Sequence, residues 1–217
     1  METLNRIVTS SIGRKLVVAL MGLLLCGFLV GHLGGNLFLF VGKDAFNAYA
    51  HHLETFPLLV PVELGLAGVA LVHILVTLYL QLTSLAARPE RYAVTQSKGG
   101  RTWGSSTMIY TAAAVLLFIV VHVATLKYGA RPSPEDLHGL VMRYFSSWGW
   151  VAFYAGCMAC LGLHLSHGFW SAFQTFGVDH PKYTPVIKGL GTAFAVAVSL
   201  AFASIPVWAR IAMGGSQ

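Results

Sequence analysis

Five long stretches of apolar residues, nearly free of charge, decide what this chain can fold into. They cover about residues 16–41, 62–87, 106–128, 147–176 and 186–209. A helix needs roughly 20 apolar residues to cross about 30 Å of hydrocarbon, and each stretch is long enough. Only 10% of the 217 residues are charged, which leaves too little polar surface for a fold surrounded by water. The sequence therefore predicts an all-α membrane protein with five transmembrane helices.

The segments between these stretches are short and show no change of composition. We therefore expect residues 1–217 to form a single transmembrane domain. Residues 44–56, in the first connecting segment, predict a short amphipathic helix at the membrane surface. In the third segment, residues 131–135 predict a turn and a helix that begins at Pro134.

The cationic side chains lie mostly on one side of the predicted membrane. That side holds the N-terminus and carries nine cations against three acids: Arg6, Arg14, Lys15, Arg88, Arg91, Lys98, Arg101, Lys182 and Lys188, against Glu2, Glu90 and Asp179. The other side carries five of each. By the positive-inside rule the N-terminus is cytoplasmic and the C-terminus is outside. The placement of the charges thus indicates orientation in a membrane, and the net charge of +6 is no sign of a nucleic-acid partner.

Histidine is the ionisable residue in the middle of the predicted spans. The first three spans carry His32, His73 and His122, and the fourth carries both His164 and His167. An imidazole in hydrocarbon needs a partner, and no charged side chain shares the middle of these spans, so a metal is expected. Haem suits such a bundle because it is a flat, largely apolar disc that takes one imidazole from each face. Histidines on four helices therefore predict two haems.

Depth in the membrane suggests how these histidines pair. At 1.5 Å per residue, His32 and His122 lie ~25 Å from the cytoplasmic ends of their helices, and His73 and His164 lie roughly 18–20 Å from theirs. The first two would therefore hold a haem nearer the outside, and the other two a haem nearer the cytoplasm. Glycines near the histidines would let a disc approach the backbone: Gly27, Gly31, Gly34, Gly35, Gly65, Gly68, Gly156, Gly162 and Gly168. Because His164 and His167 lie three residues apart on one helix face, the spacing alone leaves the choice between them open.

Three segments carry a family resemblance. They are Gly-His-Leu-Gly-Gly-Asn-Leu at 31–37, Lys-Asp-Ala-Phe-Asn at 43–47, and His-Leu-Ser-His-Gly-Phe-Trp-Ser-Ala-Phe-Gln at 164–174. Over essentially its whole length the chain resembles the di-haem cytochrome b membrane anchor, of the b558 type, of succinate dehydrogenases and quinol:fumarate reductases. The resemblance implies bis-histidine ligation by His32 with His122 and by His73 with His164. It thus implies that the ligand in the fourth span is the first histidine of the motif, His164, and not His167.

The resemblance also implies partners and a reaction. A flavoprotein subunit with covalent FAD and an iron–sulfur subunit would dock on the cytoplasmic face of the bacterial inner membrane, and the resulting heterotrimer can form a dimer. Electrons would pass between succinate or fumarate and a membrane quinone, expected to be menaquinone, through two haems b. The dicarboxylate site would lie on the flavoprotein partner.

Glu54 is the candidate catalytic residue. It lies near the end of the predicted surface helix, where the resemblance implies a glutamate that takes protons from menaquinol, and a carboxylate at a membrane interface can accept such protons. Some relatives also carry a proton-passing glutamate two residues before the fourth-span ligand, where this chain has Gly162. Candidate donors to the haem propionates cluster near the cytoplasmic face: Arg14, Lys15, Arg101, Trp103, Ser105 and Ser106.

Two other functions are compatible with these histidines. One is a di-haem cytochrome b that serves a hydrogenase, a formate dehydrogenase or a nitrate reductase. The other is a haem-free transporter that relays protons through its histidines. The 164–174 motif and the 43–47 segment favour the succinate dehydrogenase family over the first, and visible absorption of the purified protein would separate the second.

Overall fold

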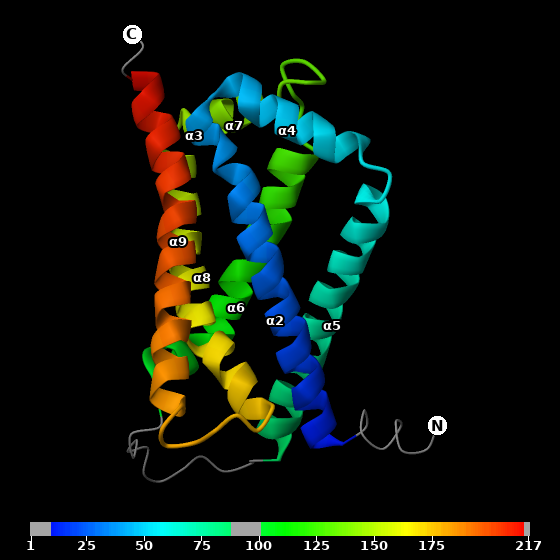
Figure 1. Cartoon of the computed structure of the whole chain (residues 1–217), viewed down its shortest axis with the longest axis vertical. Helices are drawn as coiled ribbons and strands as arrows, with labels where there is room; N and C mark the ends of the chain where they lie inside the picture. The colour runs from blue at the N-terminus through cyan, green and yellow to red at the C-terminus, as the bar shows by residue number, and fades with distance from the viewer. Residues whose placement is uncertain (1–9, 88–100, 215–217) are drawn as a thin grey trace.

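The computed structural model describes residues 10–87 and 101–214, and regular structure in these ranges is entirely helical (Figure 1). The elements are α2 (Ser11–Asn36), α3 (Phe38–Val41), α4 (Lys43–Thr55), α5 (Leu59–Ala86), α6 (Trp103–His122), the π-helical η1 (Val123–Lys127), α7 (Leu137–Phe145), α8 (Trp148–Thr175) and α9 (Thr184–Gly214). Four of the cations used to orient the chain, Arg6, Arg88, Arg91 and Lys98, lie outside the described residues.

Five helical segments are long and apolar enough to cross a membrane. They are Ser11–Val41, Leu59–Ala86, Trp103–Lys127, Trp148–Thr175 and Thr184–Met213. Each bound agrees with the predicted one to within five residues, which confirms the prediction of an all-α fold with five spans. The chain is therefore a multi-pass membrane protein.

Helix α8 forms the centre of the bundle and packs against α9, α6 and α2. Its buried side chains Met158, Leu161 and Leu165 meet Cys26 of α2 and Ala195 of α9 in one apolar cluster. A second cluster joins α8 to α3, α4, α7 and α9. It lies nearer the end of the bundle that carries α4 and α7, which we call the outer end after the predicted orientation. These clusters fix the four helices α2, α6, α8 and α9 relative to one another.

Helix α5 stands at the edge of this bundle (Figure 1). Its main neighbour is α2, and none of its residues is buried, although the structure describes all of them. A helix that packs on one neighbour leaves most of its surface available to lipid or to a bound group. Because α5 carries His73, this open flank bears directly on the candidate site.

Helices α4 and α7 lie together across the outer end of the bundle (Figure 1). The amphipathic helix predicted at 44–56 is confirmed as α4, whose own side chains Phe46 and Ala50 are buried against the bundle. Asp136 joins the two helices, because its carboxylate accepts hydrogen bonds from Lys43 and from the Asn47 amide, each at 3.1 Å. These bonds and one from the Gly139 amide, which has the largest effect, lower the pKa of Asp136 to about 2.

The predicted start of the helix after residues 131–135 is wrong by three residues. Helix α7 begins at Leu137, and Pro134 lies in the turn before it. The reason is local, because the Asp136 side chain accepts the Gly139 amide at 2.9 Å and so caps the helix. The Asp136 amide itself closes the preceding turn by donating to the Ser133 carbonyl at 3.0 Å.

Candidate functional site

The structure brings His32 of α2 and His122 of α6 together inside the bundle. Their ring centres lie 5.8 Å apart, with the ring planes at 89°. Metal–nitrogen bonds of about 2.0–2.1 Å to two imidazoles on opposite sides of one ion would put the ring centres roughly 6 Å apart. The pair therefore has the separation that a shared metal requires.

Aromatic side chains surround this pair. Phe28 stacks on His32 at 5.2 Å between ring centres, Phe202 approaches it at 5.7 Å, and Phe118 lies 5.3 Å from His122. Such a lining excludes water and offers flat apolar surfaces. It suits a large aromatic cofactor better than a hydrated ion.

Two polar side chains touch the same imidazoles. The Tyr154 hydroxyl lies 3.4 Å from Nδ1 of His122, which leaves Nε2 of that ring without a hydrogen bond to the described residues. The Asn36 amide donates to the His32 carbonyl at 2.8 Å and lies 3.4 Å from its Nε2. Contacts of this kind orient a ligating imidazole and tune its basicity.

The second predicted pair consists of His73 of α5 and His164 of α8. Nδ1 of His73 donates to the Val18 carbonyl of α2 at 3.2 Å, so its proton is on Nδ1 and Nε2 is free to ligate. His164 lies within electrostatic range of His73 and of His167. Its Nδ1 is enclosed by protein atoms yet has no hydrogen-bond partner among the described residues. An enclosed nitrogen of this kind is unusual in a finished core and calls for a partner.

The glycines near these histidines fall into two groups. A Cβ added to Gly35, Gly104 or Gly162 would come within 3 Å of a neighbouring helix, so these glycines allow close helix packing. A Cβ added to any of a second group would meet no atom within 4 Å: Gly27, Gly31 and Gly34 of α2, Gly65 and Gly68 of α5, and Gly156 and Gly168 of α8. The second group gives α2, α5 and α8 flat, open surfaces on which a disc can lie.

Paired imidazoles, an enclosed nitrogen without a partner and open glycine surfaces all fit a haem bound between two histidines. In the part of the chain that the structure describes, no three or more His, Cys, Asp and Glu side chains gather closely enough to hold a metal ion by themselves. A haem needs only two protein ligands, because the porphyrin nitrogens supply the other four. The donor set is thus more suitable for haem than for a bare ion.

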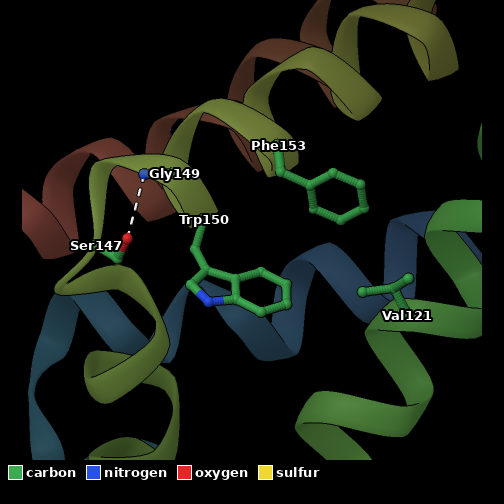
Figure 2. A pocket seen from close by; sticks show the side chains of 5 residues that line it. All are labelled: Val121, Ser147, Gly149, Trp150 and Phe153. Atoms are coloured by element: carbon green, nitrogen blue, oxygen red, sulfur yellow. Dashed lines mark hydrogen bonds between the residues drawn. The ribbon is translucent and has the colours of Figure 1, made fainter.

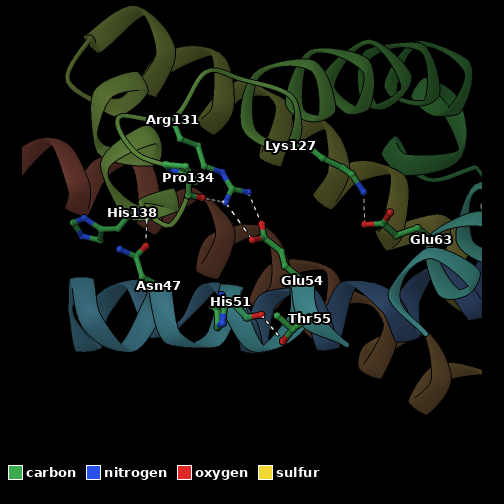
Figure 3. A network of polar contacts seen from close by, with 9 residues as sticks. All are labelled: Asn47, His51, Glu54, Thr55, Glu63, Lys127, Arg131, Pro134 and His138. Carbon is green, nitrogen blue, oxygen red and sulfur yellow. Dashed lines mark hydrogen bonds and ion pairs between the residues drawn. The ribbon is translucent and has the colours of Figure 1, made fainter. Parts of the chain in front are cut away.

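Glu54 lies at the outer end, on the last turn of α4, in a two-pronged ion pair with Arg131 (Figure 3). The two guanidinium nitrogens of Arg131 lie 2.5 and 3.3 Å from the two carboxylate oxygens, and one also donates to the Pro134 carbonyl at 2.9 Å. A second ion pair, between Glu63 of α5 and Lys127 of η1, lies beside it. The sequence did not predict this ion pair, because Arg131 is 77 residues away from Glu54 along the chain.

An aromatic groove on the outer half of α6 and α8 was also not predicted. Val121, Ser147, Gly149, Trp150 and Phe153 line this open groove of about 390 Å³ (Figure 2). The Phe153 ring lies 6.3 Å between ring centres from Phe118, which itself lies 5.3 Å from His122, so one aromatic side chain separates the groove from the first histidine pair. The aromatic residues at the start of α8 were the available signal, but only the tertiary structure brings Val121 opposite them.

The predicted propionate donors take up different places. Arg101 donates to the Ser106 hydroxyl at 2.7 Å, and Ser105 forms a capping box with Thr102 at the start of α6. The Arg14 guanidinium instead lies 4.4 Å from the centre of the Tyr79 ring of α5, while Lys15 and Trp103 are exposed. The structure gathers the α6 residues into one polar group and leaves the two cations of α2 apart from it.

Gly162 faces α9, where a Cβ at this position would lie 2.8 Å from the Ser199 hydroxyl oxygen. A helix turns about 100° per residue, so a residue two positions before His164 points to the opposite side of α8. Position 162 therefore belongs to the α8–α9 contact, and its backbone approaches α9 too closely for a glutamate side chain.

Comparisons with known proteins agree with the resemblance seen in the histidine motifs. No protein-family model matches the chain, and no solved structure matches it. Over 189 residues the chain is 24% identical to the succinate dehydrogenase cytochrome b558 subunit of Bacillus subtilis (strain 168), and the match covers 86% of this chain and 89% of the relative. Over most of its length the chain is thus similar to a succinate dehydrogenase cytochrome b558 subunit.

Proposed function

We propose that this chain is the membrane-anchor cytochrome b subunit of a succinate:quinone oxidoreductase and that it binds two haems b and a quinone. The observation that carries the proposal is the approach of His32 and His122 to 5.8 Å within an apolar aromatic lining. The similarity to a succinate dehydrogenase cytochrome b558 subunit supports it independently and favours it over a hydrogenase or formate dehydrogenase subunit. The orphaned nitrogen of His164 argues against a bundle complete without a cofactor.

His32 and His122 would hold the outer haem, and His73 and His164 the inner one. With the observed helix ends, the first pair lies about 28–32 Å from the cytoplasmic ends of α2 and α6, and the second about 16–20 Å from those of α5 and α8. Haem iron supplies one-electron transfer between soluble partners and a quinone. The chain's own part is to fix two imidazole pairs at two depths and to exclude water from them.

The outer end would handle the quinone. The aromatic groove at Trp150 and Phe153 offers flat apolar surfaces beside the outer pair, which suits a quinone ring or its isoprenoid tail. Glu54 would accept the protons that quinol oxidation releases, after its carboxylate separates from Arg131. At the cytoplasmic end, Arg101, Ser105, Ser106 and Trp103 are the gathered candidates for propionate contacts, with Arg14 and Lys15 further along the same face.

The soluble partners would be a flavoprotein subunit with FAD and an iron–sulfur subunit. By the positive-inside rule, the excess of cations supports a docking side and an N-terminus in the cytoplasm, with the complex in a bacterial inner membrane. Menaquinone is the expected quinone, and two heterotrimers can associate as a dimer. The dicarboxylate reaction would take place on the flavoprotein.

Affinity purification of the tagged chain from its native membrane tests this function. We expect the two soluble subunits to co-purify and a pyridine haemochrome assay to give about two haems b per chain. A His73→Leu variant should lose one haem and keep the other, while His180→Gln, in an exposed loop, should keep both. A wild-type preparation without haem, or a His73→Leu preparation with both haems, would contradict the proposal.

A further inference from the structure

The inner half of α8 carries a histidine that the proposed axial ligation does not use. His167 lies one helical turn from His164 on the cytoplasmic side. Its Nδ1 is enclosed by protein atoms and has no hydrogen-bond partner among the described residues. A ring nitrogen that is shielded from solvent and unpaired next to a candidate cofactor site points to a contact with that cofactor.

The neighbours of His167 hold its ring in place. The Trp170 ring lies 5.1 Å away between ring centres, with the planes at 88°. On the other flank, a Cβ added to Gly104 of α6 would lie 3.0 Å from the His167 Cβ, so the α6 backbone packs directly against this residue. His167 is therefore fixed between α6 and Trp170 and cannot swing freely into lipid.

A cation stands at the same end of α8. The Lys188 ammonium of α9 lies 4.5 Å from the centre of the Trp170 ring, and it is within electrostatic range of His167. Trp170 thus contacts both the imidazole and the ammonium. A hydrogen-bond donor and a positive charge supported by one indole form a site for a carboxylate.

The depths of these groups match the carboxylate edge of a haem. At 1.5 Å per residue, His164 lies about 16 Å from the cytoplasmic end of α8 and His167 about 12 Å, while Lys188 lies about 6 Å from the start of α9 at the same face. A haem carries two propionate carboxylates on one edge, and these seek the aqueous side of a membrane. The polar groups therefore lie between the inner iron position and the cytoplasmic face, where such an edge would pass.

We propose that His167 and Lys188 bind a propionate of the inner haem, the one assigned to His73 and His164. Nδ1 of His167 donates a hydrogen bond to the carboxylate, Lys188 neutralises its charge, and Trp170 positions both. This inference rests on the proposed function. It assigns the second histidine of the 164–174 motif a role separate from axial ligation, and it adds a contact on α8 and α9 to the group at the start of α6.

The test is a redox titration of the intact complex in its membrane, monitored by haem absorption. Lys188→Met keeps an apolar stem over Trp170 and removes the charge, and His167→Leu removes the donor. Both should keep two haems and shift the inner haem, the one lost in His73→Leu, to a lower midpoint potential, because a less compensated carboxylate favours ferric iron. His167→Gln, which retains a donor, should restore part of the shift.

Lys182→Met is the matched control, since Lys182 is at the same end of the bundle and contacts Tyr183 at 5.4 Å instead of Trp170. It should leave both potentials unchanged. An unchanged inner potential in Lys188→Met and His167→Leu would overturn the proposal. If His167→Leu does not assemble, an unchanged inner potential in Lys188→Met overturns it alone. Loss of the inner haem in His167→Gln but not in His164→Gln would overturn it too, by making His167 the axial ligand. Wild-type complex without haem would instead refute the proposed function.

Discussion

At the scale of single residues, Glu54 shows how a contact changes what a side chain can do. Its two oxygens both face the Arg131 guanidinium, which is 19% exposed, so the carboxylate is held in one orientation at the outer end. Exposed ion pairs contribute little to stability, about 0–1 kcal/mol. The contact therefore matters more for the position of the Glu54 carboxylate than for the stability of the fold.

Replacement of Glu54 by glutamine should abolish quinol oxidation while the spectra of both haems persist. The amide keeps the shape of the side chain but cannot take up a proton at neutral pH. Steady-state oxidation of a water-soluble naphthoquinol by the complex measures the first effect, and reduced-minus-oxidised absorption measures the second. Normal turnover in Glu54→Gln would remove this residue from the proton path.

Gly162 supports a second prediction at this scale. A glutamate introduced there must push α9 away from α8, because even a Cβ would lie 2.8 Å from the Ser199 hydroxyl oxygen. We expect Gly162→Glu to destabilise the chain by at least about 1–3 kcal/mol, as overpacked cores do. Gly189→Ala in α9, where an added Cβ meets nothing within 4 Å, is the control for a thermal-stability assay in detergent.

At the scale of helices, the spans were predictable and their junctions were not. Hydrocarbon allows few structures except helices of sufficient length, so the five apolar stretches fixed the spans to within five residues. The start of α7 depends on the side chain of Asp136, which caps the helix. The π-helical turn η1 directly follows His122, and the residue types in this segment do not predict it. The pairing of Glu54 with Arg131 joins segments far apart in the chain and appears only in the folded protein.

The α4–α7 contact at the outer end should depend on pH through Asp136. The pKa of this carboxyl is lowered to about 2, chiefly by the Gly139 amide, so its ionised form stabilises the fold. That contribution is complete above the ordinary aspartate pKa of 3.8 and is lost as the pH falls through about 2. Asp136→Asn should therefore melt below wild type at pH 7, and the difference should shrink at pH 3. Glu135→Gln, the neighbouring exposed acid, should show no such pattern.

At the scale of the whole molecule, α5 differs from the other four spans. Helices α2, α6, α8 and α9 share buried clusters, whereas α5 leans on α2 and buries none of its residues. The four predicted histidine positions follow from the apolar sequence, but the asymmetry of their surroundings does not. This asymmetry follows from the glycines: those of α5 face open space, whereas Gly104 of α6 and Gly162 of α8 allow close packing with a neighbouring helix.

The proposed haems should supply much of what holds α5 in place. We expect the chain made in a haem-deficient strain to expose the α2-facing side of α5. Single cysteines introduced at positions 69 and 76 in a background without Cys26, Cys157 and Cys160 would report this through alkylation rates. Faster labelling without haem is the expected outcome, and equal labelling with and without haem would mean that α5 docks on α2 unaided.

The unburied surface of α5 has a consequence for biogenesis. With so small a protein docking surface on α5, the proposed haems would make completion of the anchor depend on the supply of a small molecule. A cell short of iron or porphyrin would hold anchors with a loose second span, which membrane proteases can recognise and remove. Surveillance of cofactor supply would then be built into the shape of the protein and would need no dedicated sensor.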